Sequence, residues 1–107
     1  MANPPSLSPE QRAAALEKAA EARRLRAEVK DRLKMGLLSF SELLDEAAEN
    51  ETVGKMKVLA ALESMPRLGK VKARRLMEDV GIAESRRLRG LGDSQRSQLL
   101  ERFAADA

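Results

Sequence analysis

The stretch "MPRLGKVKARRLMEDVGI", residues 65–82, decides the fold of this chain. Pro66 stops the helix that precedes it, and Gly69 lies in a basic turn before the next helical pattern. The helix after the turn has apolar residues at Val71, Leu76 and Val80. Gly81 then ends this helix as a left-handed cap. The stretch therefore predicts two short helices joined by a tight turn.

The start of the second of these helices has the features of a phosphate site. The first amides of a helix lack partners and the helix dipole is positive there, so the amides from Leu68 to Val71 are expected to attract an anion. Gly69 keeps a side chain from holding a phosphate away from these amides, and Lys70 and Lys72 add positive charge. Ala73 would let the two helices pack closely.

Working outward, the N-terminal third predicts one long helix within residues 8–36. Ser8 and Gln11 form a capping box around a proline at the first helical position, and no strong breaker follows until Gly36. The second half of this helix carries apolar residues at helical spacing, Ala22, Leu25, Val29 and Leu33. The first half has no comparable face, so we expect it to project as an arm, preceded by a flexible leader at residues 1–7.

Besides the helix that follows the basic turn, three helices are expected downstream of residue 37. A capping box at Ser39 and Glu42 opens a short helix that ends near Asn50, and the pattern from Thr52 to Met65 predicts another single helix. Asp93 is expected to cap the last helix, whose core residues are Leu99, Leu100 and Phe103. Since no strand pattern is present, the predicted fold is all-α: a single domain with one long helix and about four shorter ones.

The charge is unevenly distributed along the chain. Residues 39–52 contain five acids and no base, whereas residues 65–92 contain eight bases and three acids. Residues 18–34 add seven bases and three acids. Two basic segments and one acidic segment suggest a polyanionic partner that docks on a defined face.

Composition excludes several kinds of site. The chain has 107 residues without cysteine or histidine, which removes zinc sites, Cys/His nucleophile pairs and the commonest general base. A lyase reaction through a Schiff base on Lys70 or Lys72 would need a carboxylate base and a pocket, for which one small helical domain leaves little room. We therefore expect no enzyme, no metal and no cofactor. No segment approaches the ~20 apolar residues of a membrane helix, which favours a cytoplasmic protein.

The segment "SRRLRG" supplies a second group of cations, Arg86, Arg87 and Arg89. Three arginines beside a glycine turn fit an electrostatic footprint for phosphates. The alternative is a solvated loop in which these arginines pair with Glu84 or Asp93. Reading of bases would need side chains such as Gln95 or Gln98, and Arg74 and Arg75 are expected to face solvent behind the turn.

The segment "LESMPRLGKVKARRLMEDVGI" resembles the helix-hairpin-helix of DNA repair proteins and the helix-two-turns-helix region of ribosomal protein S13. Those families typically show a proline, a glycine, an aliphatic residue, a second glycine and then an alanine. This chain keeps Pro66, Leu68, Gly69 and Ala73, and has Arg67 where the first glycine often stands.

Nearly the whole chain is similar to the actinobacterial integration host factors. The similarity runs through "SPEQRAAALEKAAEARR", "VGKMKV", "LGKVKA" and "RRLRGLGDSQRSQLLERF". This resemblance implies a nucleoid-associated architectural protein that binds double-stranded DNA through its backbone phosphates with low sequence specificity. It also implies effects on DNA topology and compaction, and assistance in phage site-specific integration.

The resemblance also implies where DNA is bound. Residues 37–107 would form the helix-two-turns-helix DNA-binding domain, and the helix within 8–36 with its leader would supply a second contact. The DNA-binding residues would be Arg67, Leu68, Gly69, Lys70, Lys72, Arg86, Arg87 and Arg89. A phage integrase would be a further partner of a monomer located in the nucleoid. By analogy with the ribosomal relative, the alternative is binding of structured RNA, against which stands the lack of stacking aromatics.

Overall fold

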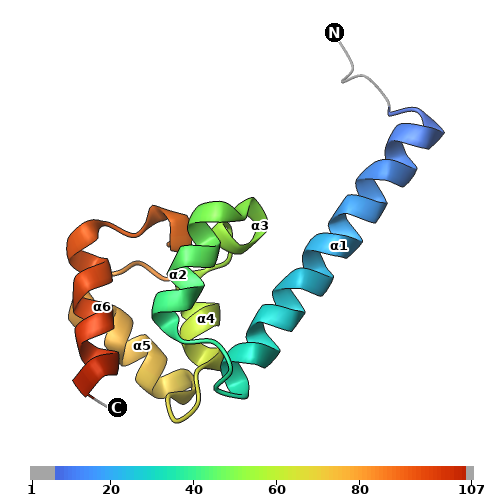
Figure 1. Ribbon diagram of the computed structural model, residues 1–107. Coiled ribbons are helices and arrows are strands. Elements are labelled where there is room, and N and C mark those ends of the chain that lie inside the picture. Colours follow the sequence, from blue (N-terminus) through green and yellow to red (C-terminus); the bar gives the residue numbers. More distant parts are fainter. Residues whose placement is uncertain (1–6, 106–107) are drawn as a thin grey trace, which may run out of the picture.

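The computed structural model describes residues 7–105, and every regular element among them is a helix (Figure 1). The α-helices are α1 (Pro9–Lys34), α2 (Phe40–Glu49), α3 (Glu51–Gly54), α4 (Val58–Ser64), α5 (Gly69–Val80) and α6 (Asp93–Ala105), with a 3-10 turn η1 (Leu88–Gly90) before α6. The predicted all-α class is confirmed. Apart from Leu7, the predicted leader lies outside the described residues.

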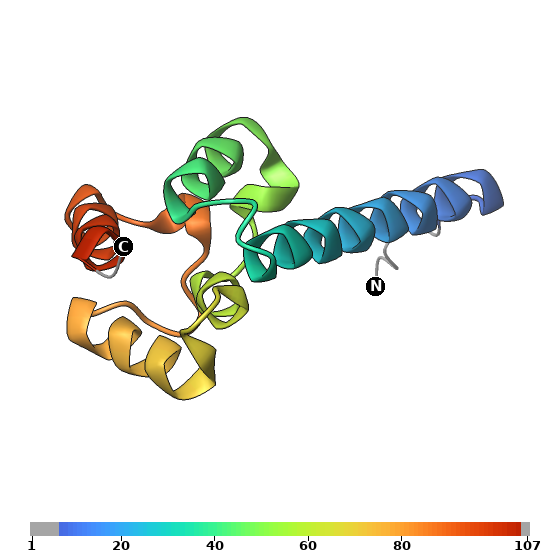
Figure 2. The same ribbon diagram turned by 60° about the horizontal axis from the view of Figure 1, so that its bottom comes forward.

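Helix α1 projects from the rest of the molecule, as Figures 1 and 2 show. The predicted capping box is present: the Ser8 hydroxyl accepts from the Gln11 amide at 3.1 Å, and the Gln11 side chain accepts from the Ser8 amide at 2.9 Å. Val29 and Leu33 are fully buried, whereas Leu16 is 64% exposed. The C-terminal half of α1 therefore joins the core, and the N-terminal half forms the expected arm.

The core lies among the five short helices and the C-terminal half of α1. The capping box of α2 is formed by Ser39 and Glu42, and the helix ends before Asn50 as predicted. The two aromatic rings of the chain, Phe40 and Phe103, pack with their centroids 5.1 Å apart, which joins the start of α2 to the last turns of α6. The remaining core side chains are aliphatic or methionine.

The prediction of a single helix for residues 52–65 is wrong, because the structure divides this segment into α3 and α4. At the break, the Val58 amide donates to the Arg86 oxygen at 3.0 Å, and the Leu88 amide donates to the Met56 oxygen at 2.9 Å. These two hydrogen bonds join segments that are about thirty residues apart, so helical periodicity could not reveal them. The domain consequently has five short α-helices rather than about four.

Helix α5 buries only part of the apolar pattern predicted for it. Val71 belongs to that pattern but is 73% exposed. The buried residues of α5 are Ala73, Leu76, Met77 and Val80, which follow the spacing of one helical face. Val71 precedes Ala73 by two residues, which places it about 200° around the helix from that face.

The start of α6 also differs from the prediction that Asp93 caps it. Asp93 is already the first residue of the helix, and Gly92 holds the cap position, since its oxygen accepts from the Arg96 amide at 2.9 Å. The Gln95 side chain accepts from the Gly92 amide at 3.1 Å. A glutamine three residues after the cap thus supplies half of a capping box, and Asp93 places its charge near the positive end of the dipole.

Candidate nucleic-acid interface

The turn between α4 and α5 has an uncommon backbone conformation. Arg67 has a φ of 70° and Gly69 a φ of 73°, so both lie in the left-handed region. Arg67 stands at the position where related families often have glycine. Its backbone adopts the left-handed conformation that glycine favours. A non-glycine residue pays about 1–2 kcal/mol for this conformation, which is typical of functional turns.

The amides at the start of α5 face an open site. Leu68 donates a long hydrogen bond of 3.4 Å to the Met65 oxygen, so its amide is engaged within the turn. The amides of Gly69, Lys70 and Val71 belong to the first turn of α5, where no helical acceptor exists. A Cβ built on Gly69 would meet no atom within 4 Å. Glycine is thus needed for its backbone conformation, and the side of the backbone where a Cβ would stand is open.

A groove of about 480 Å³ lies beside this turn and collects several predicted residues. Arg67, Leu68 and Lys72 line it, together with the packed rings of Phe40 and Phe103. Lys70 is exposed one residue after Gly69. The structure therefore brings Arg67, Leu68 and Lys72 to one groove, while Gly69 and Lys70 are exposed at the start of α5.

The three arginines of the second turn differ in how they are held. Arg86 donates from Nη1 to the Gly90 oxygen at 3.0 Å, and Arg87 donates from Nη1 to the Lys55 oxygen at 2.7 Å. Arg89 donates no hydrogen bond to any residue of the described range. Within residues 7–105 none of the three pairs with Glu84 or Asp93, and Glu84 instead lies 3.7 Å from Arg74. Arg74 and Arg75 are exposed as predicted.

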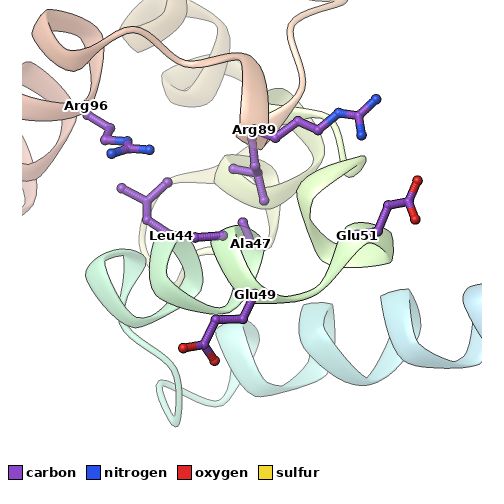
Figure 3. A pocket seen from close by; sticks show the side chains of 8 residues that line it. Leu44, Ala47, Glu49, Glu51, Arg89 and Arg96 are labelled. Atoms are coloured by element: carbon purple, nitrogen blue, oxygen red, sulfur yellow. The ribbon is translucent and has the colours of Figure 1, made fainter.

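Arg89 lines a pocket of about 370 Å³ between α2, α3 and α6. Figure 3 shows Arg89 extending above Glu51, whereas Arg96 reaches over Leu44 from the opposite side. The pKa of Glu51 is lowered mainly by the hydrogen bond and charge of Lys55, with a smaller contribution from Arg89. The Arg96 Nε atom is buried without a hydrogen-bond partner in the described part of the chain.

The two turns lie at opposite ends of α4. Residues 86–88 pair with the segment before α4, while the first turn begins directly after Ser64. Helix α4 has 7 residues, so the turns are separated by about 10 Å of helix length at 1.5 Å per residue. The candidate interface thus consists of two cationic turns with a short rigid spacer between them.

The two glutamines that were candidates for reading bases are engaged in structural contacts. Gln95 accepts from the Gly92 amide and donates to the Gly81 oxygen at 3.2 Å. Gln98 donates to the Ser94 hydroxyl at 3.1 Å. Neither side chain is presented as a free reader of base edges.

Sequence reasoning missed a group of cations next to Arg87. Lys55 and Lys57 were placed inside a continuous helix, but the break puts them beside Arg87, and Arg26 and Lys30 of α1 line the same groove. The basic run at residues 18–34 was the one available signal. Its partner surface could be found only once the tertiary fold was known.

The acidic face of α2 is tied to structural contacts. Arg32 donates to the two carboxylate oxygens of Glu46 at 3.0 and 3.3 Å. The Ser39 amide donates to the Glu42 carboxylate, which lowers the pKa of Glu42.

In the described range, no group of three acidic, histidine or cysteine residues could hold a metal ion. None of the helices in that range is long and apolar enough to cross a membrane.

Comparisons with known proteins agree with this architecture. Residues 33–103 match the family described as S13-like H2TH domain. A curated relative named integration host factor from Mycobacterium tuberculosis is 58% identical over 101 residues, which cover 94% of this chain and 96% of the relative. A protein of the same name from Streptomyces coelicolor is 58% identical over 105 residues, covering 98% and 97%.

A solved structure, described as sIHF bound to an 8-base-pair palindromic DNA, is also similar. Its TM-score is 0.79 at 55% sequence identity, and the match covers 81% of this chain and 98% of that chain. The matched range of the H2TH family spans both cationic turns. The chain therefore belongs to the integration host factor family whose helical domain is of the S13-like H2TH type.

Proposed function

We propose that this chain binds double-stranded DNA through its backbone phosphates, as a nucleoid-associated architectural protein of low sequence specificity. The observation that carries the proposal is the first turn, where Gly69 opens α5 with amides that have no helical acceptor, and the exposed Arg67, Lys70 and Lys72 lie within three residues of it. Amides at the positive end of a helix dipole bind phosphate oxygens, and the nearby cations neutralise the charge. The solved relative with bound DNA supports this choice of ligand.

Low specificity follows from the type of contact that the surface offers. Phosphate contacts position a protein on a duplex but carry no sequence information directly. Gln95 and Gln98 are engaged in hydrogen bonds within the protein, so direct reading of bases has no evident side chain here. Sequence preference would then arise from the shape and deformability of the DNA.

The proposed role has further parts. The protein acts by binding rather than by catalysis, in the nucleoid of the cytoplasm, where it affects DNA topology and compaction. It assists phage site-specific integration, with a phage integrase as a protein partner, and it is a monomer in solution. Residues 37–107 carry the main DNA contact and residues 8–36 a second one. The names of the curated relatives support the link with integration.

A titration tests the proposal. We would titrate a ~20 base-pair duplex, a matched single strand and a structured RNA at two salt concentrations, since phosphate binding is salt-dependent. Neutralisation of four to six phosphates predicts a slope of log K against log salt of roughly −4 to −5. Tight, salt-sensitive duplex binding that tolerates changes of sequence is expected. Preference for the RNA, or duplex binding that ignores salt, would overturn the proposal.

A further inference from the structure

A second cationic groove lies apart from the first turn, on the side of the molecule next to α1. It has a volume of about 220 Å³ and is bordered by α1, the connection between α3 and α4, and the second turn. Met56 and Ala60 form its apolar part. Its charged lining is Arg26, Lys30, Lys55, Lys57 and Arg87, and no carboxylate belongs to it.

The charges of this groove are largely uncompensated within the protein. Lys55 lies 2.9 Å from the Glu51 carboxylate. Among residues 7–105, the other four cations have no carboxylate within ion-pairing distance. Arg26 and Lys30 are also half-buried. Removing an unpaired charge from water is costly, so these two half-buried cations, with the exposed Lys57 and Arg87 beside them, favour a bound anion.

The groove is held in shape before any ligand arrives. Arg87 donates to the Lys55 oxygen at 2.7 Å, and Lys57 and Arg87 face each other in an antiparallel bridge. The hydrogen bonds of Val58 and Leu88 flank this bridge on both sides. Because the backbones that carry Lys55, Lys57 and Arg87 are fixed to one another, an anion that binds here needs little reorganisation.

A second pocket beside α1, of about 310 Å³, is lined by Leu25, Glu46 and Glu49, with no cation in its lining. Glu46 is nevertheless paired with Arg32 of α1, which donates to both of its carboxylate oxygens. A carboxylate of the acidic pocket is thus compensated from within the protein, whereas most cations of the groove are not, which favours a polyanion at the groove.

We infer that the groove lined by Arg26, Lys30, Lys55, Lys57 and Arg87 binds a backbone phosphate of the same DNA duplex that the second turn contacts. The inference rests on the proposed function, because the anion is taken to be DNA. Arg87 belongs to both the second turn and the groove, so a strand that leaves the second turn reaches α1 through it. The groove thereby fixes the direction of α1 relative to the duplex.

The test combines a double variant with neutral phosphates. The variant Lys30→Gln/Lys57→Gln removes one cation from α1 and one from the connection between α3 and α4. The control Arg74→Gln/Arg75→Gln removes the same charge from exposed positions of α5 outside the groove. With a ~20 base-pair duplex, the groove variant should bind roughly tenfold more weakly at low salt, and its salt slope should be less steep by about 1. The control should change affinity less than threefold.

Scanning the duplex with single methylphosphonates, which lack the phosphate charge, then locates the contact. At one or two phosphates, neutralisation should weaken wild-type binding and leave the groove variant unaffected, because the partner cations are already gone. Lys57→Gln alone, at an exposed side chain, repeats the measurement without risk to the fold.

The outcomes separate the two proposals. If wild-type protein binds the duplex with steep salt dependence but the groove variant behaves like the control, the groove inference is wrong and the proposed function stands. Equal sensitivity of both proteins to every methylphosphonate would have the same meaning. A wild-type protein that does not bind the duplex would overturn the proposed function and the inference with it.

Discussion

Arg87 donates a hydrogen bond of 2.7 Å from its guanidinium to the main-chain oxygen of Lys55, which lies 32 residues earlier in the chain. The contact ties the second turn to the break between α3 and α4. Arg87 therefore has a structural role in addition to its proposed role in DNA binding. Its neighbour Arg89 donates no hydrogen bond to the described residues, so the two arginines should respond differently to substitution.

We expect Arg89→Gln to weaken duplex binding by about threefold to tenfold while the melting temperature stays within about 1 °C, because only a phosphate contact is lost. Arg87→Gln should weaken binding to a similar degree and also lower the free energy of unfolding by about 1 kcal/mol, the usual worth of such a hydrogen bond. Thermal melting and duplex titration of both variants check this. Equal melting temperatures would show that the bond to Lys55 adds no stability.

Replacing Arg86, Arg87 and Arg89 together by glutamine should greatly weaken binding and make the salt slope less steep by about 2 to 3. The variant should remain folded but melt below wild type, since the contacts of Arg86 and Arg87 with main-chain oxygens are lost. Circular dichroism monitors the fold and a titration at several salt concentrations gives the slope. Unchanged affinity in a folded variant would mean that the second turn is not a DNA site.

Substitutions at the two left-handed residues of the first turn, Arg67 and Gly69, should change the free energy of unfolding in opposite directions. Gly69→Ala should lower the free energy of unfolding by about 1 kcal/mol, because its φ of 73° strains any side chain although the surrounding space is open. Arg67→Gly should raise it by up to about 0.5–1 kcal/mol by relieving the same strain. Arg67→Gly should nevertheless bind DNA more weakly, since a cation is removed. Chemical denaturation and titration on the same samples separate these two effects.

Gly54 is required by close packing rather than by its backbone angles. A Cβ there would lie 2.8 Å from the Ala47 oxygen and 3.3 Å from Arg89 Cβ. Gly54→Ala should therefore cost about 1–3 kcal/mol of stability and displace the second turn, weakening DNA binding as well. Gly92→Ala is a control with a smaller expected loss, since the nearest atom to its added Cβ is 3.7 Å away.

The capping box of α2 should make the stability of the protein depend on pH. The Ser39 amide, which donates to the Glu42 carboxylate at 3.0 Å, holds the pKa of Glu42 below its usual value of 4.5. A lowered pKa means that Glu42 contributes stability above pH 4.5, and that this contribution is lost as the pH falls through the lowered value. Glu42→Gln keeps an acceptor for the amide but cannot be protonated. Its melting temperature should thus fall less than that of wild type on acidification below pH 4.5, and Glu49→Gln is the matched control.

Local signals explain how much of the fold was predictable. Ser8, Ser39 and Gly81 act on hydrogen bonds within four residues of themselves, so the ends of α1, α2 and α5 follow from the sequence. The break at Lys55–Lys57 depends on pairing with residues 86–88, and the exposure of Val71 depends on which face of α5 the core covers. The pairing at the break leaves no periodic trace in the sequence, whereas the helical spacing of Ala73, Leu76, Met77 and Val80 already sets Val71 off the buried face once that face is known.

The sequence by itself determined the helical class, the caps, the basic turn at residues 66–70 and the three arginines of the second turn, because these depend on residue type and short spacing. Only the tertiary structure decided that α4 separates the two turns, that Arg87 holds Lys55, and that Arg26, Lys30 and Lys57 share one groove. The physical reason is that burial and main-chain pairing are contacts between distant segments. Such contacts select which charged residues become neighbours only after the chain has packed.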